Sequence, residues 1–405
     1  MKDKQKILLL ENIHSYAKEK LEAEGFQVDL LEAALDESGL DAKLSDYSAV
    51  GIRSKTQLTE SVLRKNNSLV AIGAFCIGTN QIDLETSNKK GVPVFNAPYS
   101  NTRSVAELVL AEMIALSRKL GDINTMAHKG QWNKSAQGSN EIRGKSLGII
   151  GYGHIGSQVS VLAEALGLQV RYYDVIRKLP MGNARAEDSL ESLLWQSDFI
   201  SLHVPETPLT VNMMDAERIR QMKKGSFLIN ASRGTVVDID ALHAALMEGH
   251  LAGAAIDVFP TEPESNKERF ESKLQGLSNV ILTPHIGGST EEAQASIGVE
   301  VADALTAYLK SGRTTSAVNF PRLDIPDLTS GFRLINVHQN VPGVLGQING
   351  IVSKEGVNIR AQYLSTDPKI GYLVLDMEEG DAQAVADQVA ALKVSIQSRL
   401  VEPRT

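Results

Sequence analysis

The chain has 405 residues, a length that predicts two or three domains. Its net charge of −8 argues against a nucleic-acid surface, and its single cysteine, Cys76, excludes a disulfide within the chain. No run of about 20 mainly apolar residues is present, and the apolar residues 7–10 are too few for a secretion signal. We therefore expect a cytoplasmic protein that does not span a membrane.

The region before residue 100 alternates short apolar runs with amphipathic stretches, which predicts a parallel α/β domain. We expect strands at residues 6–10, 49–52, 69–72 and 92–95, and helices at residues 15–24, 59–66 and 83–90. A longer apolar helix over residues 104–118 leads into a second domain. The polar stretch 130–143 that follows predicts a loop, in which we assign Trp132 to a subunit contact.

A glycine-rich turn, Gly151-Tyr152-Gly153-His154-Ile155-Gly156, lies between a predicted strand at residues 146–150 and a predicted helix at residues 157–167. Gly151 allows the tight turn, Gly153 lets backbone amides approach a pyrophosphate, and Gly156 lets the helix pack on the strand. The phosphates then meet the positive end of the helix. A glycine turn by itself is common, but these flanks together indicate a dinucleotide-binding unit.

Asp174 closes the next predicted strand, at residues 169–173. A carboxylate at this point accepts hydrogen bonds from the adenosine ribose hydroxyls and repels a 2′-phosphate. The sequence therefore predicts NAD as the cofactor rather than NADP.

Strand and helix patterns continue beyond this unit. Strands are expected at residues 199–203, 227–230, 254–258 and 280–282, and helices at residues 215–221, 239–248 and 289–309. The last helix has no following strand of the same sheet, so we expect it to return to the first domain. Residues 319–329, with two prolines, predict a linker.

The remaining residues predict a small βαββαβ module of the ferredoxin-like kind. Its strands are expected at residues 333–339, 357–364, 371–377 and 394–400, and its helices at residues 343–354 and 382–392. Exposed sheet edges in such a module favour pairing with a second copy.

The expected fold class is thus α/β, with two doubly wound parallel-sheet domains, one of the Rossmann type, and a C-terminal ferredoxin-like domain. We expect a substrate-binding domain made of residues 1–100 and 288–329, an NAD-binding domain at 101–287 and a regulatory domain at 330–405.

Three polar side chains follow strands whose carboxyl ends meet at one edge of the predicted sheet: Arg233, Glu262 and His285. Each alone is an ordinary surface residue, but their common placement favours a catalytic site without a metal. A histidine accepts a proton near neutral pH, a glutamate beside the histidine favours the charged imidazolium, and an arginine binds a carboxylate through two N–H groups. This set suits the oxidation of a 2-hydroxy acid beside a nicotinamide.

At this point the sequence resembles the D-isomer-specific 2-hydroxyacid dehydrogenases, from about Lys6 to the C-terminus. The matching motifs are Asn80-Gln81-Ile82-Asp83, Phe95-Asn96-Ala97-Pro98, residues 100–107, residues 151–156, residues 230–234, Asp257-Val258-Phe259 and Pro284-His285-Ile286-Gly287-Gly288. The resemblance implies that Arg233 binds the substrate carboxylate, that Glu262 partners the base and that His285 is the base.

The resemblance also implies further binding residues. The cofactor would be lined by His154, Ile155, His203, Ala231, Asp257 and Gly288 together with Arg233, His285, Asp174 and the three glycines. The substrate would be held by Arg53, Ser54, Asn101 and Lys134, as in family members that act on 3-phosphoglycerate. The implied activity is NAD-dependent oxidation of 3-phosphoglycerate to 3-phosphohydroxypyruvate at the start of phosphorylated serine biosynthesis, with reduction of 2-oxoglutarate as a side activity.

The C-terminal module resembles an ACT domain, a small amino-acid-binding fold. The resemblance implies that His338, Asn340 and Asn358 bind L-serine between two paired modules, that serine inhibits the enzyme, and that the chain forms a homotetramer. A plain oligomerisation module is the alternative.

The residues leave three questions open. The turn Arg53-Ser54-Lys55 offers three donors to a phosphate, but it is also typical of a solvated basic turn. The substrate could be lactate, glyoxylate or a similar acid. The chain could also be a non-catalytic NAD-sensing scaffold, although the complete Arg233–Glu262–His285 set argues against that role.

Overall fold

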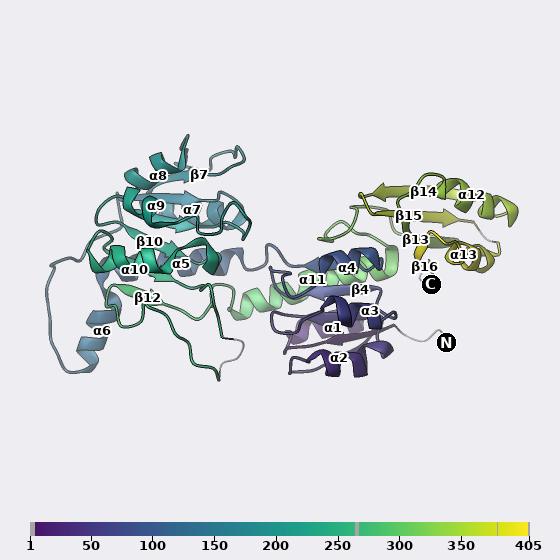
Figure 1. Ribbon diagram of the computed structural model, residues 1–405, viewed down its shortest axis with the longest axis horizontal. Coiled ribbons are helices and arrows are strands. Elements are labelled where there is room, and N and C mark those ends of the chain that lie inside the picture. Colours follow the sequence, from purple (N-terminus) through teal and green to yellow (C-terminus); the bar gives the residue numbers. More distant parts are fainter. Residues whose placement is uncertain (1–4, 264–266, 379, 404–405) are drawn as a thin grey trace. The chain divides into compact units, whose positions relative to one another are not determined.

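The computed structural model describes residues 5–263, 267–378 and 380–403. The chain divides into two compact units, Met1–Ser100 with Gln294–Thr405, and Asn101–Ala293 (Figure 1). Within the described residues, no helix combines the length and the apolar character that crossing a membrane requires.

The N-terminal part of the first unit contains a parallel sheet with the order β2-β1-β3-β4-β5. Its strands are β1 (Lys6–Leu9), β2 (Gln27–Leu30), β3 (Ala49–Ile52), β4 (Ala71–Ala74) and β5 (Val94–Asn96). Its helices are α1 (Ser15–Ala23), α2 (Glu37–Lys43), α3 (Glu60–Lys65) and α4 (Leu84–Lys89). Both faces of the sheet are covered, because Leu9 belongs to the core under α1 and Leu8 to the core under α2 and α3.

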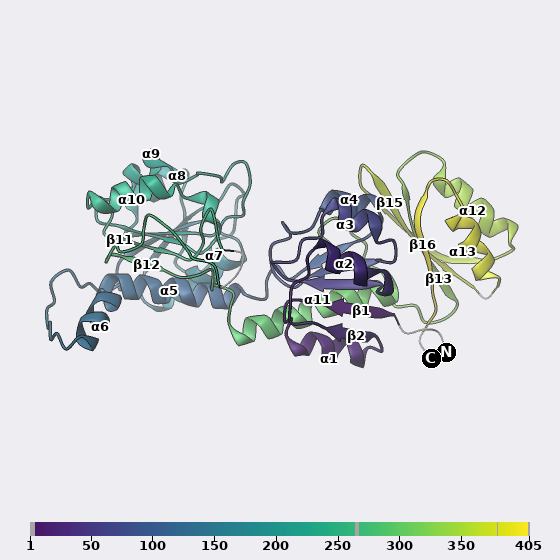
Figure 2. The same ribbon diagram turned by 60° about the horizontal axis from the view of Figure 1, so that its bottom comes forward.

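Helix α11 (Glu291–Ser311) packs against this sheet (Figure 2). Its apolar residues Ile297, Val301 and Leu305 share one core with Leu9. Helix α11 follows the last strand of the second unit but completes the hydrophobic core of the first unit.

The sequence left β2 and α2 unassigned. Gln27 and Asp29 interrupt the apolar pattern of β2, which is an edge strand with one buried residue, Val28. Helix α2 contains a glycine and buries only Leu40. Both elements depend on tertiary contacts more than on local pattern.

The C-terminal module is an antiparallel sheet of order β14-β15-β13-β16 with two helices. Its elements are β13 (Phe332–Gln339), α12 (Val344–Lys354), β14 (Ile359–Thr366), β15 (Ile370–Met377), α13 (Ala382–Ala390) and β16 (Ser395–Val401). Alternate residues of β13 point to opposite faces, so Leu334 meets α12 and α13 while Ile335 joins the core around α11. The predicted βαββαβ order is confirmed.

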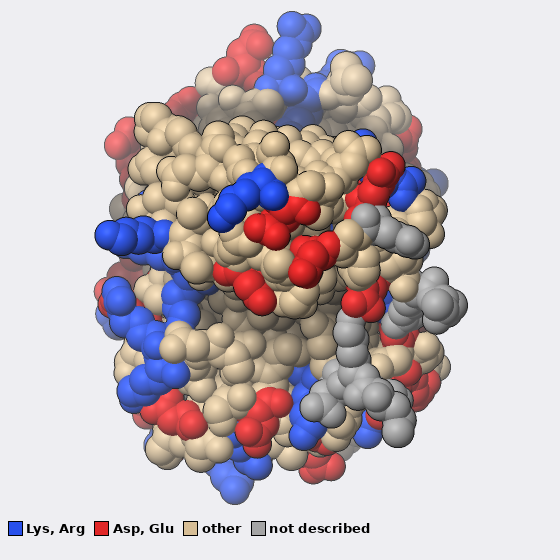
Figure 3. All heavy atoms as spheres, turned by 90° about the vertical axis from the view of Figure 1, so that its right-hand side faces the viewer, with Lys and Arg blue, Asp and Glu red and all other residues tan. Residues whose placement is uncertain are grey.

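This module is tied to the C-terminal end of α11 within the first unit. The Tyr372 hydroxyl donates to the Gly312 carbonyl at 2.6 Å, and Arg399 donates to the Tyr308 carbonyl at 2.6 Å. The fully buried Arg333 forms an ion pair with Asp376, with 2.7 Å between Nη2 and Oδ2, and also donates to the Ser311 carbonyl. Figure 3 shows positive and negative side chains interspersed over the surface seen from the side of this module.

The second unit contains a parallel sheet of order β12-β11-β10-β9-β6-β7-β8. Its strands are β6 (Ser146–Ile150), β7 (Gln169–Tyr173), β8 (Arg185–Ala186), β9 (Phe199–Leu202), β10 (Phe227–Asn230), β11 (Gly253–Ile256) and β12 (Val280–Leu282). Helices α5 (Thr102–Arg118) and α7 (His154–Ala165) cover one face, and α8 (Leu190–Gln196), α9 (Ala216–Gln221) and α10 (Ile239–Met247) cover the other. The strand order reverses between β6 and β9, which is where ligands bind in this class of sheet.

Helix α6 (Leu120–His128) was not predicted. Its apolar residues Leu120, Ile123 and Met126 recur at helical spacing, but none of its residues is buried. The loop expected at residues 130–143 is present as turns and irregular chain, and the Trp132 side chain there is 90% exposed. Its assignment to a subunit contact stays a prediction.

The predicted α/β fold class is confirmed by the two parallel sheets and the ferredoxin-like module. The proposed boundaries of three separate domains stay a prediction, since residues 330–405 are grouped with the first unit.

Candidate active site

Three neighbouring strands of the second unit carry the predicted catalytic side chains at their carboxyl ends. Arg233 follows β10, Glu262 follows β11, and His285 follows β12. Because β10, β11 and β12 are adjacent and parallel, these three segments leave the sheet at the same edge.

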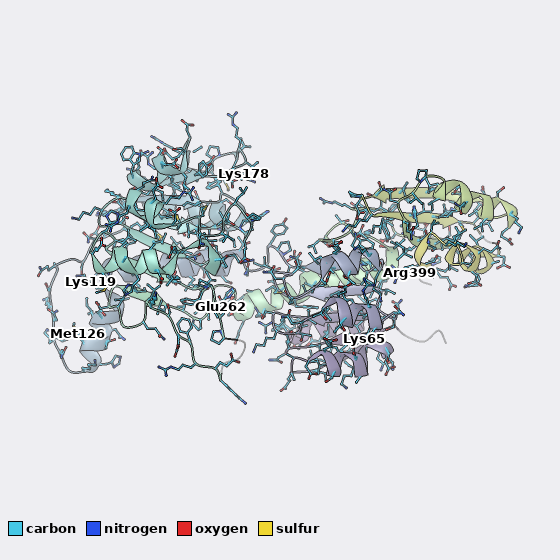
Figure 4. The ribbon with its side chains drawn as sticks, viewed as in Figure 1. Lys65, Lys119, Met126, Lys178, Glu262 and Arg399 are labelled. Carbon is cyan, nitrogen blue, oxygen red and sulfur yellow. The ribbon has the colours of Figure 1, made fainter. Side chains whose placement is uncertain are left out.

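A hydrogen bond joins two of them. His285 Nδ1 lies 2.7 Å from Glu262 Oε2, and Glu262 Oε1 accepts the Phe259 backbone N–H at 3.0 Å. The glutamate, labelled in Figure 4, is thus fixed at both oxygens. With Nδ1 engaged, His285 has Nε2 as the ring nitrogen that can exchange a proton with a ligand.

The electrostatics of the pair favour a charged imidazole. The Glu262 hydrogen bond and negative charge raise the pKa of His285 against the opposing effect of partial desolvation, since about half of the side chain (53%) remains exposed. Burial raises the pKa of Glu262, but the hydrogen bonds from His285 and Phe259 and the nearby positive charges outweigh it, so that pKa is lowered. The pair therefore holds a basic histidine beside an ionised carboxylate.

The backbone around His285 is held by Asp257, which is 1% exposed. Its carboxylate accepts the Ile286 N–H at 2.8 Å, the Gly287 N–H at 2.9 Å and the Thr283 hydroxyl at 2.6 Å. His285 itself has a φ of +54°, a left-handed conformation that a non-glycine residue rarely adopts. These hydrogen bonds offset the cost of that conformation and fix the direction of the imidazole.

The turn that carries Arg233 is pressed against the segment that carries Glu262. A Cβ on Gly234 would lie 2.0 Å from the Phe259 carbonyl carbon, so only glycine fits there. The Arg233 carbonyl accepts a hydrogen bond from the Asn230 side-chain amide at 3.0 Å, and Nη1 of Arg233 donates to the Ser232 carbonyl at 2.7 Å. The remaining guanidinium donors are available for a carboxylate.

The glycine turn after β6 forms the expected cradle. Gly151 has a φ of +90°, and a Cβ there would lie 2.3 Å from the His203 carbonyl oxygen. A Cβ on Gly156 would lie 2.1 Å from the Gly151 carbonyl oxygen, whereas none of the described atoms lies within 4 Å of one on Gly153. Two glycines are thus needed for packing, and the third leaves the backbone open where α7 begins at His154, followed by Ile155.

Asp174 lies at the end of β7, where its Oδ2 accepts the Tyr152 N–H at 2.8 Å and its Oδ1 the Ile176 N–H at 2.9 Å. These bonds hold the carboxylate beside the cradle, with acceptor capacity left for ribose hydroxyls.

His203 shares a hydrogen bond of 2.8 Å with the Ser201 hydroxyl, and burial lowers the pKa of His203 to about 4, which keeps the ring neutral. The half-buried Ala231 follows β10. The cradle, the acid and the helix terminus fit NAD.

Two predicted residues of the second unit lie together at the start of α5. A Cβ on Gly288 would lie 2.6 Å from the Asn101 Nδ2 atom, so the asparagine amide faces the Gly287-Gly288 turn. Asn101 Oδ1 is buried, and no described group donates to it. Lys134 lies exposed in the irregular chain after α6. Arg53 and Ser54 belong to the other unit, on the turn after β3.

The predicted effector residues lie at opposite ends of the C-terminal sheet. His338 and Asn340 are at the end of β13 that pairs with Ile370, whereas Asn358 precedes β14 at the end that pairs with Met377. Strand β15 spans roughly 23 Å between those ends at about 3.3 Å per residue. One module therefore does not bring the three residues together.

The sequence pattern missed two buried carboxylates. Glu112 on α5 is 3% exposed, and burial, with a smaller effect of Asp257, raises its pKa to about 8. Glu11 after β1 is 7% exposed and accepts backbone N–H groups from the turn of Arg53. An acid within the apolar pattern of α5 was a usable signal for Glu112, but Glu11 looks like an ordinary loop residue in the sequence.

Comparison with known families agrees with this geometry. Residues 110–287 match the family described as D-isomer specific 2-hydroxyacid dehydrogenase, NAD binding domain. Residues 334–397 match the AHAS small subunit-like ACT domain. The predicted cofactor, NAD, and the predicted class of enzyme, an NAD-dependent dehydrogenase, are confirmed.

Close relatives extend over the whole chain. The D-3-phosphoglycerate dehydrogenase of Escherichia coli K12 is 54% identical over 403 residues, which are 99% of this chain and 98% of the relative. The enzyme of the same name from Dictyostelium discoideum is 51% identical over 400 residues, 99% of this chain and 98% of that one. The structure of an Aquifex aeolicus D-lactate dehydrogenase complexed with NAD and lactic acid superposes with a TM-score of 0.69, at 30% identity, over 78% of this chain and 99% of that one. The chain belongs to the D-3-phosphoglycerate dehydrogenase family of D-isomer-specific 2-hydroxyacid dehydrogenases.

Proposed function

We propose that this enzyme oxidises 3-phosphoglycerate to 3-phosphohydroxypyruvate, the first step of phosphorylated serine biosynthesis. The observation that carries the proposal is the hydrogen-bonded His285–Glu262 pair beside Arg233 at the cofactor edge of the sheet, in a chain whose full-length relatives are named for this substrate. We include reduction of 2-oxoglutarate as a side activity and a cytoplasmic location in the proposal.

The residues of the second unit divide the chemistry between them. Bound NAD would supply the acceptor for the hydride that leaves C2 of the substrate. His285 Nε2 accepts the proton of the C2 hydroxyl, and Glu262 stabilises the imidazolium that forms. Arg233 binds the substrate carboxylate through its fork of donors and stabilises the carbonyl oxygen that develops at C2.

The phosphate requires donors of its own, which we assign to Arg53, Ser54, Asn101 and Lys134. In an acidic chain such donors must be gathered locally, and Arg53, Ser54 and Lys55 follow one another on a single turn. Within the described residues, the side chains of this turn form no hydrogen bond or ion pair, which leaves these three donors available to an anion. A substrate without phosphate, such as lactate, would have no use for this turn.

We further propose that L-serine inhibits the enzyme by binding between C-terminal modules of two chains in a homotetramer. The placement of Asn358 at the opposite end of the sheet from His338 and Asn340 supports a shared site, because an antiparallel pair of modules brings opposite ends together. The module is attached to the end of α11, and that helix begins shortly after His285. A coupling free energy between the two sites can pass along this helix.

A substrate panel tests the proposed activity. Purified protein with NAD should turn over 3-phosphoglycerate with a kcat/KM at least about 100-fold above that for D-glycerate or D-lactate, because charge-assisted bonds to phosphate are lost with those acids. NADH formation at 340 nm gives the rates. A preference for an unphosphorylated acid would contradict the substrate, and no turnover with any acid would favour a non-catalytic NAD-binding protein.

The pH dependence of turnover tests the His285–Glu262 pair. Hydroxyacid oxidation needs neutral His285, so kcat/KM should fall as the pH drops through the raised pKa of His285. Glu262→Gln removes the charge that raises this pKa, so the acidic limb should move to lower pH while the maximum rate falls. Titration of the substrate phosphate affects all variants equally. Glu271→Gln, on an exposed residue of the same segment, should leave the profile unchanged; an unshifted Glu262→Gln profile would remove Glu262 from its role.

Serine titration tests the effector proposal. Millimolar L-serine should lower the rate of NADH formation from 3-phosphoglycerate, and Asn358→Ala should weaken this inhibition about tenfold or more, because it removes an amide that holds the amino acid. Exposed Asp387→Ala on α13 of the same module serves as the control. Equal inhibition of Asn358→Ala and the control, or none of the wild type, would leave only an oligomerisation role for the module.

A further inference from the structure

Glu11, directly after β1, places a buried carboxylate under the turn that follows β3. Its Oε1 accepts the Arg53 N–H at 3.1 Å and the Thr56 N–H at 2.8 Å, and its Oε2 accepts the Lys55 N–H at 2.9 Å. The residue is 7% exposed, so these bonds are shielded from water. Such charge-assisted bonds to backbone N–H groups are among the stronger ones in proteins.

The same turn is held from the other side. The Arg53 carbonyl accepts a hydrogen bond from the Gln81 side-chain amide, and the Cys76 thiol lies 3.7 Å from that oxygen. Gln81 is itself 8% exposed. Both polar groups of the Arg53 backbone are therefore fixed by buried side chains, which sets the direction in which the guanidinium leaves the turn.

The backbone at Glu11 is strained in a way that serves this contact. Glu11 has a φ of +62° and Asn12 a φ of +50°, and a left-handed backbone conformation is unfavourable for a non-glycine residue. The Glu11 N–H donates a hydrogen bond to the Ala33 carbonyl, and the Asn12 N–H donates one to the Leu31 carbonyl; these bonds hold both residues in this conformation. Strain of this kind persists where the surroundings over-determine the conformation, and such places cluster at functional sites.

Converging backbone N–H groups in a turn form a nest that binds anions. Here the chain's own carboxylate fills the nest, so an external phosphate cannot use these N–H groups. The side chains of the turn remain for it: Arg53 is half-buried, and Ser54 and Lys55 are exposed.

We propose that Glu11, with Gln81 opposite, is a positioning residue for phosphate recognition: it fills the nest and aims the side chains of Arg53, Ser54 and Lys55 at the substrate phosphate. This inference rests on the proposed function, since it takes the phosphate of 3-phosphoglycerate as the group that the turn binds.

Two effects of Glu11 on an anion oppose each other. Its negative charge repels a phosphate nearby, whereas its hydrogen bonds hold the donors in place. Three backbone N–H groups already solvate the carboxylate, which weakens the field that a ligand meets. Positioning therefore dominates, and removal of the charge should weaken phosphate binding rather than strengthen it.

The test compares Glu11→Gln and Glu11→Ala in the intact enzyme. Glutamine keeps one acceptor oxygen and alanine keeps none, so KM for 3-phosphoglycerate should rise about tenfold in the first and further in the second, with kcat nearly unchanged. KM for NAD, and kcat/KM for D-glycerate, which lacks the phosphate, should stay at the wild-type values. Gln81→Met should raise KM for 3-phosphoglycerate in the same selective way.

Asp36→Asn is the matched control, because Asp36 also accepts a backbone N–H in this unit, at the start of α2, away from the turn. It should leave every constant unchanged. Equal losses with 3-phosphoglycerate and D-glycerate would make Glu11 merely structural, and a lower KM in Glu11→Gln would show that repulsion dominates; either result overturns the inference. Absence of 3-phosphoglycerate turnover in the wild type would instead contradict the proposed function.

Discussion

The contact between Glu262 and His285 is the interaction on which the catalytic account depends. The two residues follow different strands, and their side chains meet only because β11 and β12 are adjacent and parallel. The ionised carboxylate gives the imidazole both its orientation and its raised pKa, so geometry and basicity have one physical origin. Asp257 holds the backbone under His285, and Gly234 lets the arginine turn approach the glutamate segment.

We propose that different residues recognise the two ends of the substrate. The carboxylate is assigned to Arg233 in the unit that binds the cofactor, and the phosphate to a turn of the other unit. In both places buried acids hold backbone N–H groups: Asp257 those of the histidine loop, and Glu11 those of the Arg53 turn. Each of these acids fixes the backbone from which an assigned functional side chain extends.

Much of this architecture could be predicted from sequence, because it follows local pattern. The glycine turn at 151–156 and the strands that end before Arg233, Glu262 and His285 gave the edge at which the site lies, and the α/β class with its βαββαβ module was correct. The edge strand β2 carries no such pattern, and the short helix α6 buries none of its residues. Glu11 could not be found either, because its partners are 42 to 45 residues away and only the fold brings them together. For the same reason the roles of Arg53 and Asn358 stay predictions.

The most direct test of the account is the turnover of His285→Ala beside its affinity for NADH. The imidazole is assigned the proton transfer and only lines the cofactor, which the glycine turn and Asp174 are assigned to hold. The value of kcat for 3-phosphoglycerate oxidation should therefore fall at least about 100-fold, while the dissociation constant for NADH, measured by fluorescence, stays near the wild-type value. An unchanged kcat would contradict the mechanism. A parallel loss of NADH binding would show that His285 supports the cofactor instead of the chemistry.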